Sequence, residues 1–206
     1  KQSRKHPAAC GATILAMAYL REAEDIMVNL TIDGKAISVE ENTNHYGGCR
    51  GKWNTDPKTV HLKGINEIAA CRVCVVELEG KDRLITSCNN VAKTAGDPYQ
   101  QPKVRRHRRT TVEMILSQHD CECVTCPRSG NCSLQKVAND LNIFDNPYKS
   151  EIERQPWNKN FPLIRDSSKC IKCMRCVQVC DKIQGLSVWD VEGTGSRTTI
   201  NVGGHR

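Results

Sequence analysis

The chain has 206 residues, of which 38% are hydrophobic and only 4% aromatic, yet it contains thirteen cysteines. So little apolar material cannot build one large core, and small domains of this kind usually depend on disulfides or metals. The only early apolar stretch, residues 12–20, is too short to span a bilayer and precedes no clear signal-peptidase site. We therefore expect reduced, metal-binding thiols in the cytoplasm rather than a secreted, disulfide-linked protein.

The formal net charge is +7, and the densest basic run is RRHRR at residues 105–109. One interpretation is a nucleic-acid partner. The other is that surplus lysine and arginine offset the negative charge of thiolate-bound clusters or steer an acidic redox partner. We favour the second and expect no nucleic acid.

Alternating polar and apolar residues predict a hairpin over 27–41 (MVNLTIDGKAISVEE) with its turn at Asp33-Gly34. Two further strands are expected at 74–78 and 83–86. Pro98 and Pro102 are expected to bracket a loop, and residues 1–26 match no pattern.

Helical spacing predicts a helix over 110–118, with Val112, Ile115 and Leu116 on one side. A second helix is expected over 133–141, with its apolar stripe facing a core. Residues 146–161 are polar and contain two prolines, so they are expected to form a linker.

Cys71, Cys74 and Cys88 form a C-x2-C pair with one distant partner. Iron–sulfur clusters take thiolates from such a short loop plus a ligand that the fold brings in. The surrounding sequence, KGINEIAACRVCVVELEGKDRLITSC, resembles the N-terminal [2Fe-2S] domain of iron-only hydrogenases and of the large iron–sulfur subunit of NADH dehydrogenase. This resemblance covers nearly all of residues 27–206 and implies a β-grasp fold for the first domain.

His119, Cys123, Cys126 and Cys132 lie within HDCECVTCPRSGNC. One imidazole and three thiolates also suit a structural zinc ion, which leaves a zinc-bearing nucleic-acid-binding protein as an alternative. The family resemblance implies instead a [4Fe-4S] cluster bound by these four side chains. Cys121, inside the gap, is not expected to be a ligand.

Cys170, Cys173, Cys176 and Cys180 form CIKCMRCVQVC, one half of a bacterial two-cluster ferredoxin pattern. In that arrangement the first three cysteines bind one cluster and the fourth binds the other. The companion half is absent, so a truncated domain is expected and a nonfunctional truncated product is a further alternative. The phrases SQHDCEC and GTGSRTTI resemble the hydrogenases, including the hydrogenase subunit of NAD(P)-linked complexes, more than NADH dehydrogenase.

The resemblance implies a fourth [2Fe-2S] cysteine at position 60, where this chain has Val60. Cys49 is the nearest upstream cysteine and lies too early for the usual loop. A one-nucleotide shift across residues 44–61 can read TIMAAAGANGIQIPKLC, which restores an amphipathic helix and places a cysteine at position 60. We therefore hypothesise two compensating one-base changes around this segment, so that the chain as written binds its [2Fe-2S] cluster poorly or not at all.

These patterns predict an α+β chain with an unassigned stretch (1–26), a β-grasp [2Fe-2S] ferredoxin-like domain (27–104), a small helical histidine-ligated [4Fe-4S] domain (105–146) and a truncated ferredoxin-type domain (147–206). We expect it to relay single electrons for a hydrogenase or NADH dehydrogenase type oxidoreductase. The expected partners are a redox protein or other subunits of such a complex, without direct membrane insertion. No acid–base catalytic set is visible, so a catalytic centre within this chain is not expected.

Overall fold

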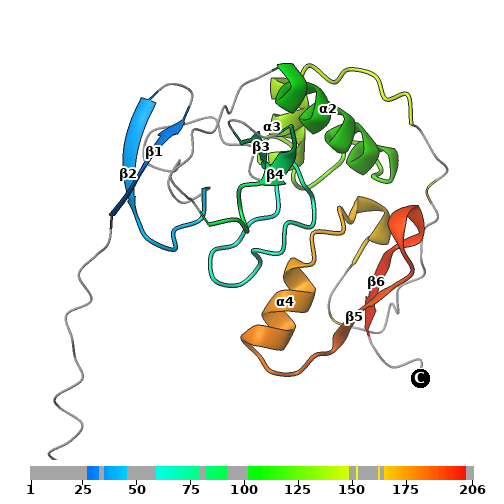
Figure 1. Ribbon diagram of the computed structural model, residues 1–206. Helices are drawn as coiled ribbons and strands as arrows, with labels where there is room; N and C mark the ends of the chain where they lie inside the picture. Colours follow the sequence, from blue (N-terminus) through cyan, green and yellow to red (C-terminus); the bar gives the residue numbers. More distant parts are fainter. Residues whose placement is uncertain are drawn as a thin grey trace, which may run out of the picture.

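The fold is given by a computed structural model (Figure 1) that describes residues 27–32, 35–45, 59–78, 82–91, 102–148, 152, 162 and 165–202. Residues 1–26, the Asp33-Gly34 turn and most of the predicted linker lie outside the described residues. The elements in chain order are β1 (Met27–Ile32), β2 (Lys35–Glu40), β3 (Val75–Glu77), β4 (Leu84–Thr86), α2 (Pro102–Ser117), α3 (Ser133–Asp140), a 3-10 turn (Ser167–Lys169), α4 (Arg175–Lys182), β5 (Trp189–Glu192), a second 3-10 turn (Gly195–Arg197) and β6 (Thr199–Val202).

The predicted hairpin is confirmed, because β1 and β2 pair antiparallel along their whole length from Met27–Glu40 to Ile32–Lys35. Its inward-facing residues Leu30, Ile37 and Val39 are buried together with Val76 of β3. This alternation of buried and exposed residues is what a strand with one wet face requires.

The two short strands that follow are also confirmed at their centres. β3 and β4 pair antiparallel, from Val75–Thr86 to Glu77–Leu84. Each is shorter than the sequence predicts. Cys74 falls just outside β3, and its carbonyl accepts a hydrogen bond from Ser87 N at 3.0 Å, so this cysteine belongs to the loop rather than the strand.

Helix α2 begins at Pro102, which corrects the prediction of a loop ending there and a helix starting at 110. Proline suits the first position of a helix because its φ is already helical and its missing N–H is not needed there. Val104, Arg108 and Val112, spaced four residues apart, are the buried side of α2. Arg108 is charged, so apolar residues at helical spacing do not predict a helix that begins as early as Pro102. Arg108 Nη2 instead donates to the carbonyl of Val75 at 2.7 Å, fastening α2 to β3.

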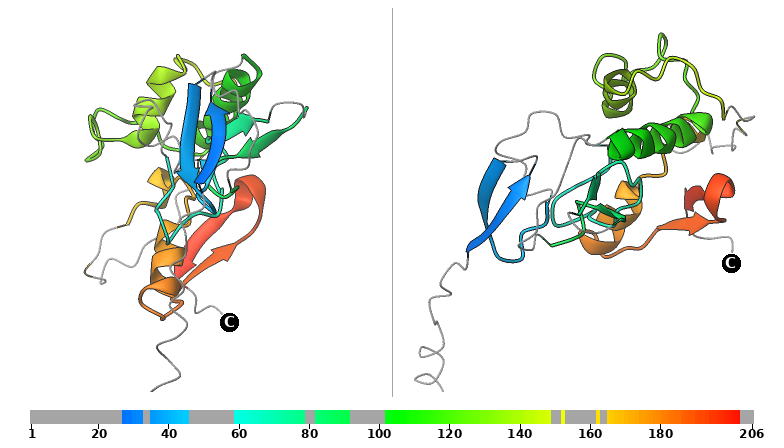
Figure 2. Two further views of the ribbon diagram at one scale, coloured as in Figure 1. Left: turned by 60° about the vertical axis from the view of Figure 1, so that its left-hand side comes forward. Right: turned by 45° about the horizontal axis from the view of Figure 1, so that its top comes forward.

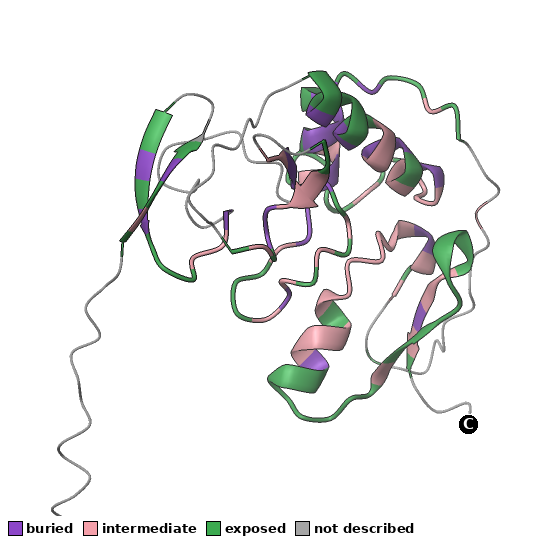
Figure 3. Ribbon diagram, viewed as in Figure 1, coloured by how far each residue is buried: buried purple, intermediate pink, exposed green. Residues whose placement is uncertain are grey.

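Helix α3 packs beside α2, and its predicted apolar face is confirmed as buried (Figure 3). The main core consists of Val73, Val112, Leu134, Val137, Ala138, Leu141 and Ile143. Buried residues concentrate around α2, α3 and β3, whereas α4 is largely of intermediate exposure and the β5–β6 hairpin is mostly exposed.

The last part of the described chain forms α4 and the β5–β6 hairpin, neither of which the sequence patterns predicted. Strands β5 and β6 pair from Trp189–Val202 to Glu192–Thr199. Helix α4 lies beside the loop of residues 59–74 in both Figure 1 and Figure 2, and Lys182 Nζ donates to the Ile65 carbonyl at 2.8 Å. Among the described residues, no helix has the length and apolarity needed to cross a bilayer.

Candidate iron–sulfur sites

The three cysteines of the first site lie in the loops that flank β3 and β4. Cys74 and Cys88 are buried and pack against each other, and Cys71 is half-buried. The hydrogen bond between Cys88 and Cys74 lowers the pKa of Cys74 and raises that of Cys88. Burial raises the pKa of Cys71. One member of the buried pair is thus biased toward the thiolate, the form that binds metal.

Residue 60 lies next to this site. Val60 is 4% exposed. Its neighbour Thr59 has its hydroxyl 3.5 Å from Cys71 Sγ. The valine side chain offers no ligand atom, so the described residues supply three thiols here and not four.

Two of the cysteine loops contain residues in the left-handed region: Arg72 (φ 52°) between Cys71 and Cys74, and Lys172 (φ 54°) between Cys170 and Cys173. Such residues turn successive backbone N–H groups toward one point and form anion-binding concavities, of the kind found at many iron–sulfur sites. The backbone N of Lys172 lies 3.4 Å from Cys170 Sγ, as expected of a loop that stabilises a thiolate.

The second site begins at the end of α2. The backbone N of His119 donates to Leu116 O at 3.2 Å, which continues the last turn of the helix. Its Nδ1 is buried and has no hydrogen-bond partner within the described chain. Burial, followed by the charge of Lys169, lowers the pKa of His119. A neutral imidazole with one unsatisfied nitrogen fits the role of a cluster ligand.

The three cysteines of this site are half-buried in a series of tight turns. Cys123 N donates to Cys121 O at 2.7 Å and Cys126 N donates to Cys123 O at 3.3 Å. Cys132 is the N-cap residue of α3. The turns therefore keep the cysteines in one compact loop between α2 and α3.

Cys121 is exposed, and its thiol donates to the His119 carbonyl at 3.2 Å. Burial of part of the thiol raises its pKa. The assignment of Cys121 as a non-ligand stays a prediction.

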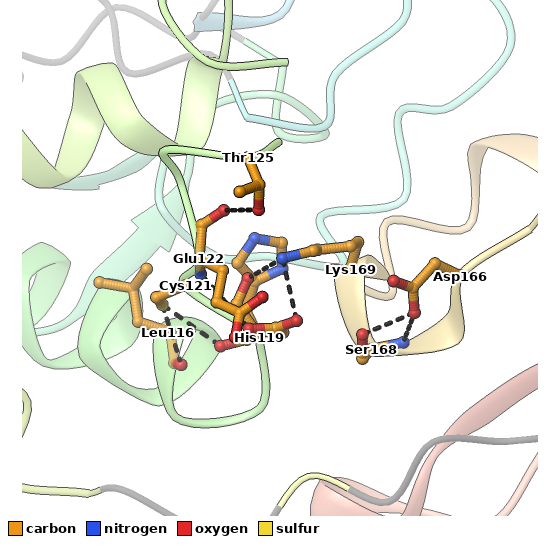
Figure 4. A network of polar contacts seen from close by, with 9 residues as sticks. Leu116, His119, Cys121, Glu122, Thr125, Asp166, Ser168 and Lys169 are labelled. Carbon is orange, nitrogen blue, oxygen red and sulfur yellow. Dashed lines mark hydrogen bonds and ion pairs between the residues drawn. The ribbon is translucent and has the colours of Figure 1, made fainter. Parts of the chain in front are cut away.

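A polar network joins the second site to the third (Figure 4). Lys169 Nζ donates to the Asp120 carbonyl at 2.9 Å and pairs with Asp120 Oδ2 at 3.0 Å. The backbone N of Asp120 donates to Ser168 O at 2.9 Å. Asp166 Oδ1 accepts from the backbone N and the hydroxyl of Ser168, at 2.9 and 2.6 Å. Sequence reasoning missed Asp120 and Lys169, although each directly flanks a predicted ligand and could have been found for that reason.

The ammonium of Lys169 is stabilised by this surrounding negative charge. The hydrogen bond to Asp120 is the main cause that raises the pKa of Lys169, and Cys126 and Glu122 add to it. Lys169 is therefore electrostatically close to Cys126 as well as adjacent in sequence to Cys170.

The third site spans the loop before α4 and the helix itself. Cys170 and Cys173 are half-buried, Cys176 is exposed and Cys180 is buried. Burial is the main cause that raises the pKa of Cys176, and the neighbouring thiols Cys173 and Cys170 add to it. Cys180 Sγ accepts a hydrogen bond from Val188 N at 3.3 Å. Cys176 thus lies within electrostatic range of Cys170 and Cys173, and a backbone N–H binds Cys180.

Within the described residues, no group of three or more His, Cys, Asp or Glu side chains is spaced to hold one metal ion. The thiol and imidazole donors, the N–H···S contacts of Cys170 and Cys180, and the unsatisfied His119 nitrogen are compatible with the ligands of iron–sulfur clusters.

These features define an iron–sulfur cluster-binding protein. Two family matches agree with this class: residues 25–95 match the family described as a 2Fe-2S iron–sulfur cluster binding domain, and residues 108–147 match the iron–sulfur binding region of NADH-ubiquinone oxidoreductase-G. The first match contains Cys71, Cys74 and Cys88. The second contains His119, Cys123, Cys126 and Cys132.

Three relatives show which proteins share this region. The chain is 36% identical to NADPH-Fe(3+) oxidoreductase subunit alpha of Geobacter sulfurreducens, over 85% of this chain and 21% of that protein. It is 35% identical to NADP-reducing hydrogenase subunit HndD of Solidesulfovibrio fructosivorans, over 79% and 29%. It is 28% identical to the mitochondrial NADH-ubiquinone oxidoreductase 78 kDa subunit of Neurospora crassa, over 97% and 27%.

The chain therefore contains iron–sulfur cluster binding regions that are similar to those of hydrogenase and NADH dehydrogenase type oxidoreductase subunits, as the sequence resemblance predicts. It spans only 21% to 29% of the length of these relatives. A solved structure of an NAD+-reducing [NiFe]-hydrogenase in the H2-reduced state shares the fold, with a TM-score of 0.76 at 22% identity over 86% of this chain and 76% of that one.

Proposed function

We propose that this chain is the electron relay of such an oxidoreductase, with ligands drawn from its three cysteine sites. The observation that carries the proposal is that loops from all three sites meet on one core. One residue from each site packs against the hydrophobic core that contains Val73 and Val112: Cys71 from the first site, Cys132 from the second and Ile171 from the third. Electron transfer between centres requires this closeness, and no acid–base chemistry is needed.

Two further features, a shared cavity and a polar contact, support the relay. Cys71 and Cys170 line the same cavity of about 380 Å³ between the first and third sites. Lys169 and Asp120 tie the second site to the third. An iron–sulfur cluster bound at such a site would accept and release one electron at a potential set by its ligands, hydrogen bonds and burial.

The proposed ligands are those that the spacing predicts. His119, Cys123, Cys126 and Cys132 would hold a [4Fe-4S] cluster, and Cys71, Cys74 and Cys88 would hold a [2Fe-2S] cluster that lacks one ligand. Cys170, Cys173 and Cys176 would hold another [4Fe-4S] cluster, with Cys180 serving a neighbouring one. The proposed domains are 27–104, of β-grasp type, 105–146, and 147–206.

Impairment of the first site at Val60 is part of the proposal, as is the altered frame of residues 44–61. The burial of residue 60 and the 3.5 Å contact between Thr59 and Cys71 support it, because a ligand at position 60 would reach the same site. We further propose a cytoplasmic location, with a redox protein or other subunits of a hydrogenase or dehydrogenase complex as partners.

Anaerobic reconstitution with iron and sulfide tests the proposal. Broad visible absorption and acid-labile sulfide are expected, with a reduced [4Fe-4S] signal in electron paramagnetic resonance. Cys126→Ala should remove that cluster, whereas Cys121→Ala, a matched change in the same loop, should leave it intact. Colourless protein that binds zinc would overturn the proposal, and equal cluster loss in both variants would overturn the ligand assignment.

A further inference from the structure

The contact between Lys169 and Asp120 is partly shielded from water. The side chains of Lys169 and Asp120 are 24% and 14% exposed, and Nζ contacts both the carbonyl and the carboxylate of Asp120 at 2.9 and 3.0 Å. Exposed ion pairs contribute little to stability, whereas the interactions of partly buried charges are screened much less by solvent and salt. The pair lies directly beside His119 on one side and Cys170 on the other.

We propose that Lys169 and Asp120 are positioning residues that tune, with opposite signs, the reduction potential of the cluster bound by His119. This inference rests on the proposed function. Reduction adds one electron and one negative charge to the site while no bond forms or breaks, with dithionite as the electron donor in the test. A nearby ammonium stabilises the added charge and a nearby carboxylate opposes it.

The same pair also fixes the loop in place. The Lys169 ammonium donates to the carbonyl of Asp120 while the N–H of Asp120 donates to Ser168 O at 2.9 Å. Two hydrogen bonds thus hold Asp120, which follows His119, against Ser168 and Lys169, which precede Cys170. A purely structural role for Lys169 would affect cluster content, whereas a charge role shifts the potential of a fully loaded site.

The experiment is a dithionite titration of the reconstituted full chain, followed by electron paramagnetic resonance. Labelling histidine with nitrogen-15 identifies the signal of the His119 site through its hyperfine coupling. At a fixed potential, Lys169→Met should lower the ratio of reduced to oxidised cluster by about threefold or more. Asp120→Asn should raise that ratio, and Lys169→Arg should stay close to the wild type.

Iron and sulfide content are measured for every variant, so that loss of the cluster is distinguished from a change in its potential. Unchanged potentials in fully loaded Lys169→Met and Asp120→Asn would overturn the inference, as would shifts of the same sign. If the wild-type chain showed no histidine-coupled cluster signal, the proposed function itself would fail. Lys136→Met, which removes an exposed lysine of α3 paired with Asp140, is the matched control.

Discussion

Asn66 and Cys173 are 107 residues apart in the chain, yet Asn66 Nδ2 donates to the Cys173 carbonyl at 2.9 Å. The same amide donates to Val60 O, also at 2.9 Å. Arg175 Nε donates to that carbonyl as well, at 3.0 Å. One buried asparagine and one arginine therefore fasten position 60 of the first site to the loop of the third.

Asn66→Ala should lower the free energy of unfolding by about 1–3 kcal/mol, because it removes one buried and one part-buried hydrogen bond and leaves both carbonyls with fewer donors. Asn66 is only 1% exposed. Urea unfolding of the reconstituted protein, followed by circular dichroism, measures the effect. Asn139→Ala, at an exposed position of α3, is the control and should change stability by less than about 0.5 kcal/mol. Equal effects of the two changes would show that the Asn66 contacts do not stabilise the fold.

Val60→Cys should improve loading of the first site, because it supplies the fourth thiolate that a [2Fe-2S] cluster needs. We expect about two additional irons per chain after reconstitution and a [2Fe-2S] absorption spectrum, from the stoichiometry of that cluster. Val91→Cys is the matched control, since Val91 is 42% exposed and adds a thiol without completing a site. If both variants gained the same iron, position 60 would not be a ligand position.

Removal of iron with a chelator should unfold the cysteine loops before it unfolds the main core. Metal binding supplies much of the folding free energy in small metal-dependent domains. Hydrogen exchange of residues 119–132 and 165–182 should therefore accelerate by about tenfold or more. The amides of α2 and α3 around Val112 and Val137, which are buried in the core, should change less. A well-dispersed amide spectrum of the iron-free loops would contradict this expectation.

Lys103 forms exposed ion pairs with Asp82 and with Glu77, the latter at 3.0 Å. The hydrogen bond from Lys103 lowers the pKa of Asp82. The Lys103–Asp82 pair therefore stabilises the fold at pH values above the ordinary aspartate pKa of about 3.9. This stabilisation is lost as the pH falls through the lowered pKa of Asp82. Lys103→Met should raise the pKa of Asp82 toward its ordinary value in an NMR titration. Lys136→Met should leave the pKa of Asp82 unchanged. If the pKa of Asp82 were also unchanged in Lys103→Met, the coupling between Lys103 and Asp82 would be refuted.

Patterns of residue spacing were enough to predict the iron–sulfur class and much of the local structure. The spacing of His119 and of the cysteines is a covalent property of the chain, and it led to the iron–sulfur class that the family matches confirm. Period-two and helical patterns were sufficient for the β1–β2 hairpin and for the buried face of α3, since both depend on neighbours within a few residues.

Which sites lie close together, and which contacts hold them, could be seen only in the folded chain. Arg108 extends the buried side of α2 because Val75 O is there to accept its hydrogen bond, which no helical period reveals. Asn66 and Lys169 gain their roles from partners that other loops supply, Asn66 from Cys173 more than a hundred residues away and Lys169 from Asp120. Polar contacts between distant segments depend on the path of the whole chain, because one hydrogen bond leaves no periodic trace in the sequence.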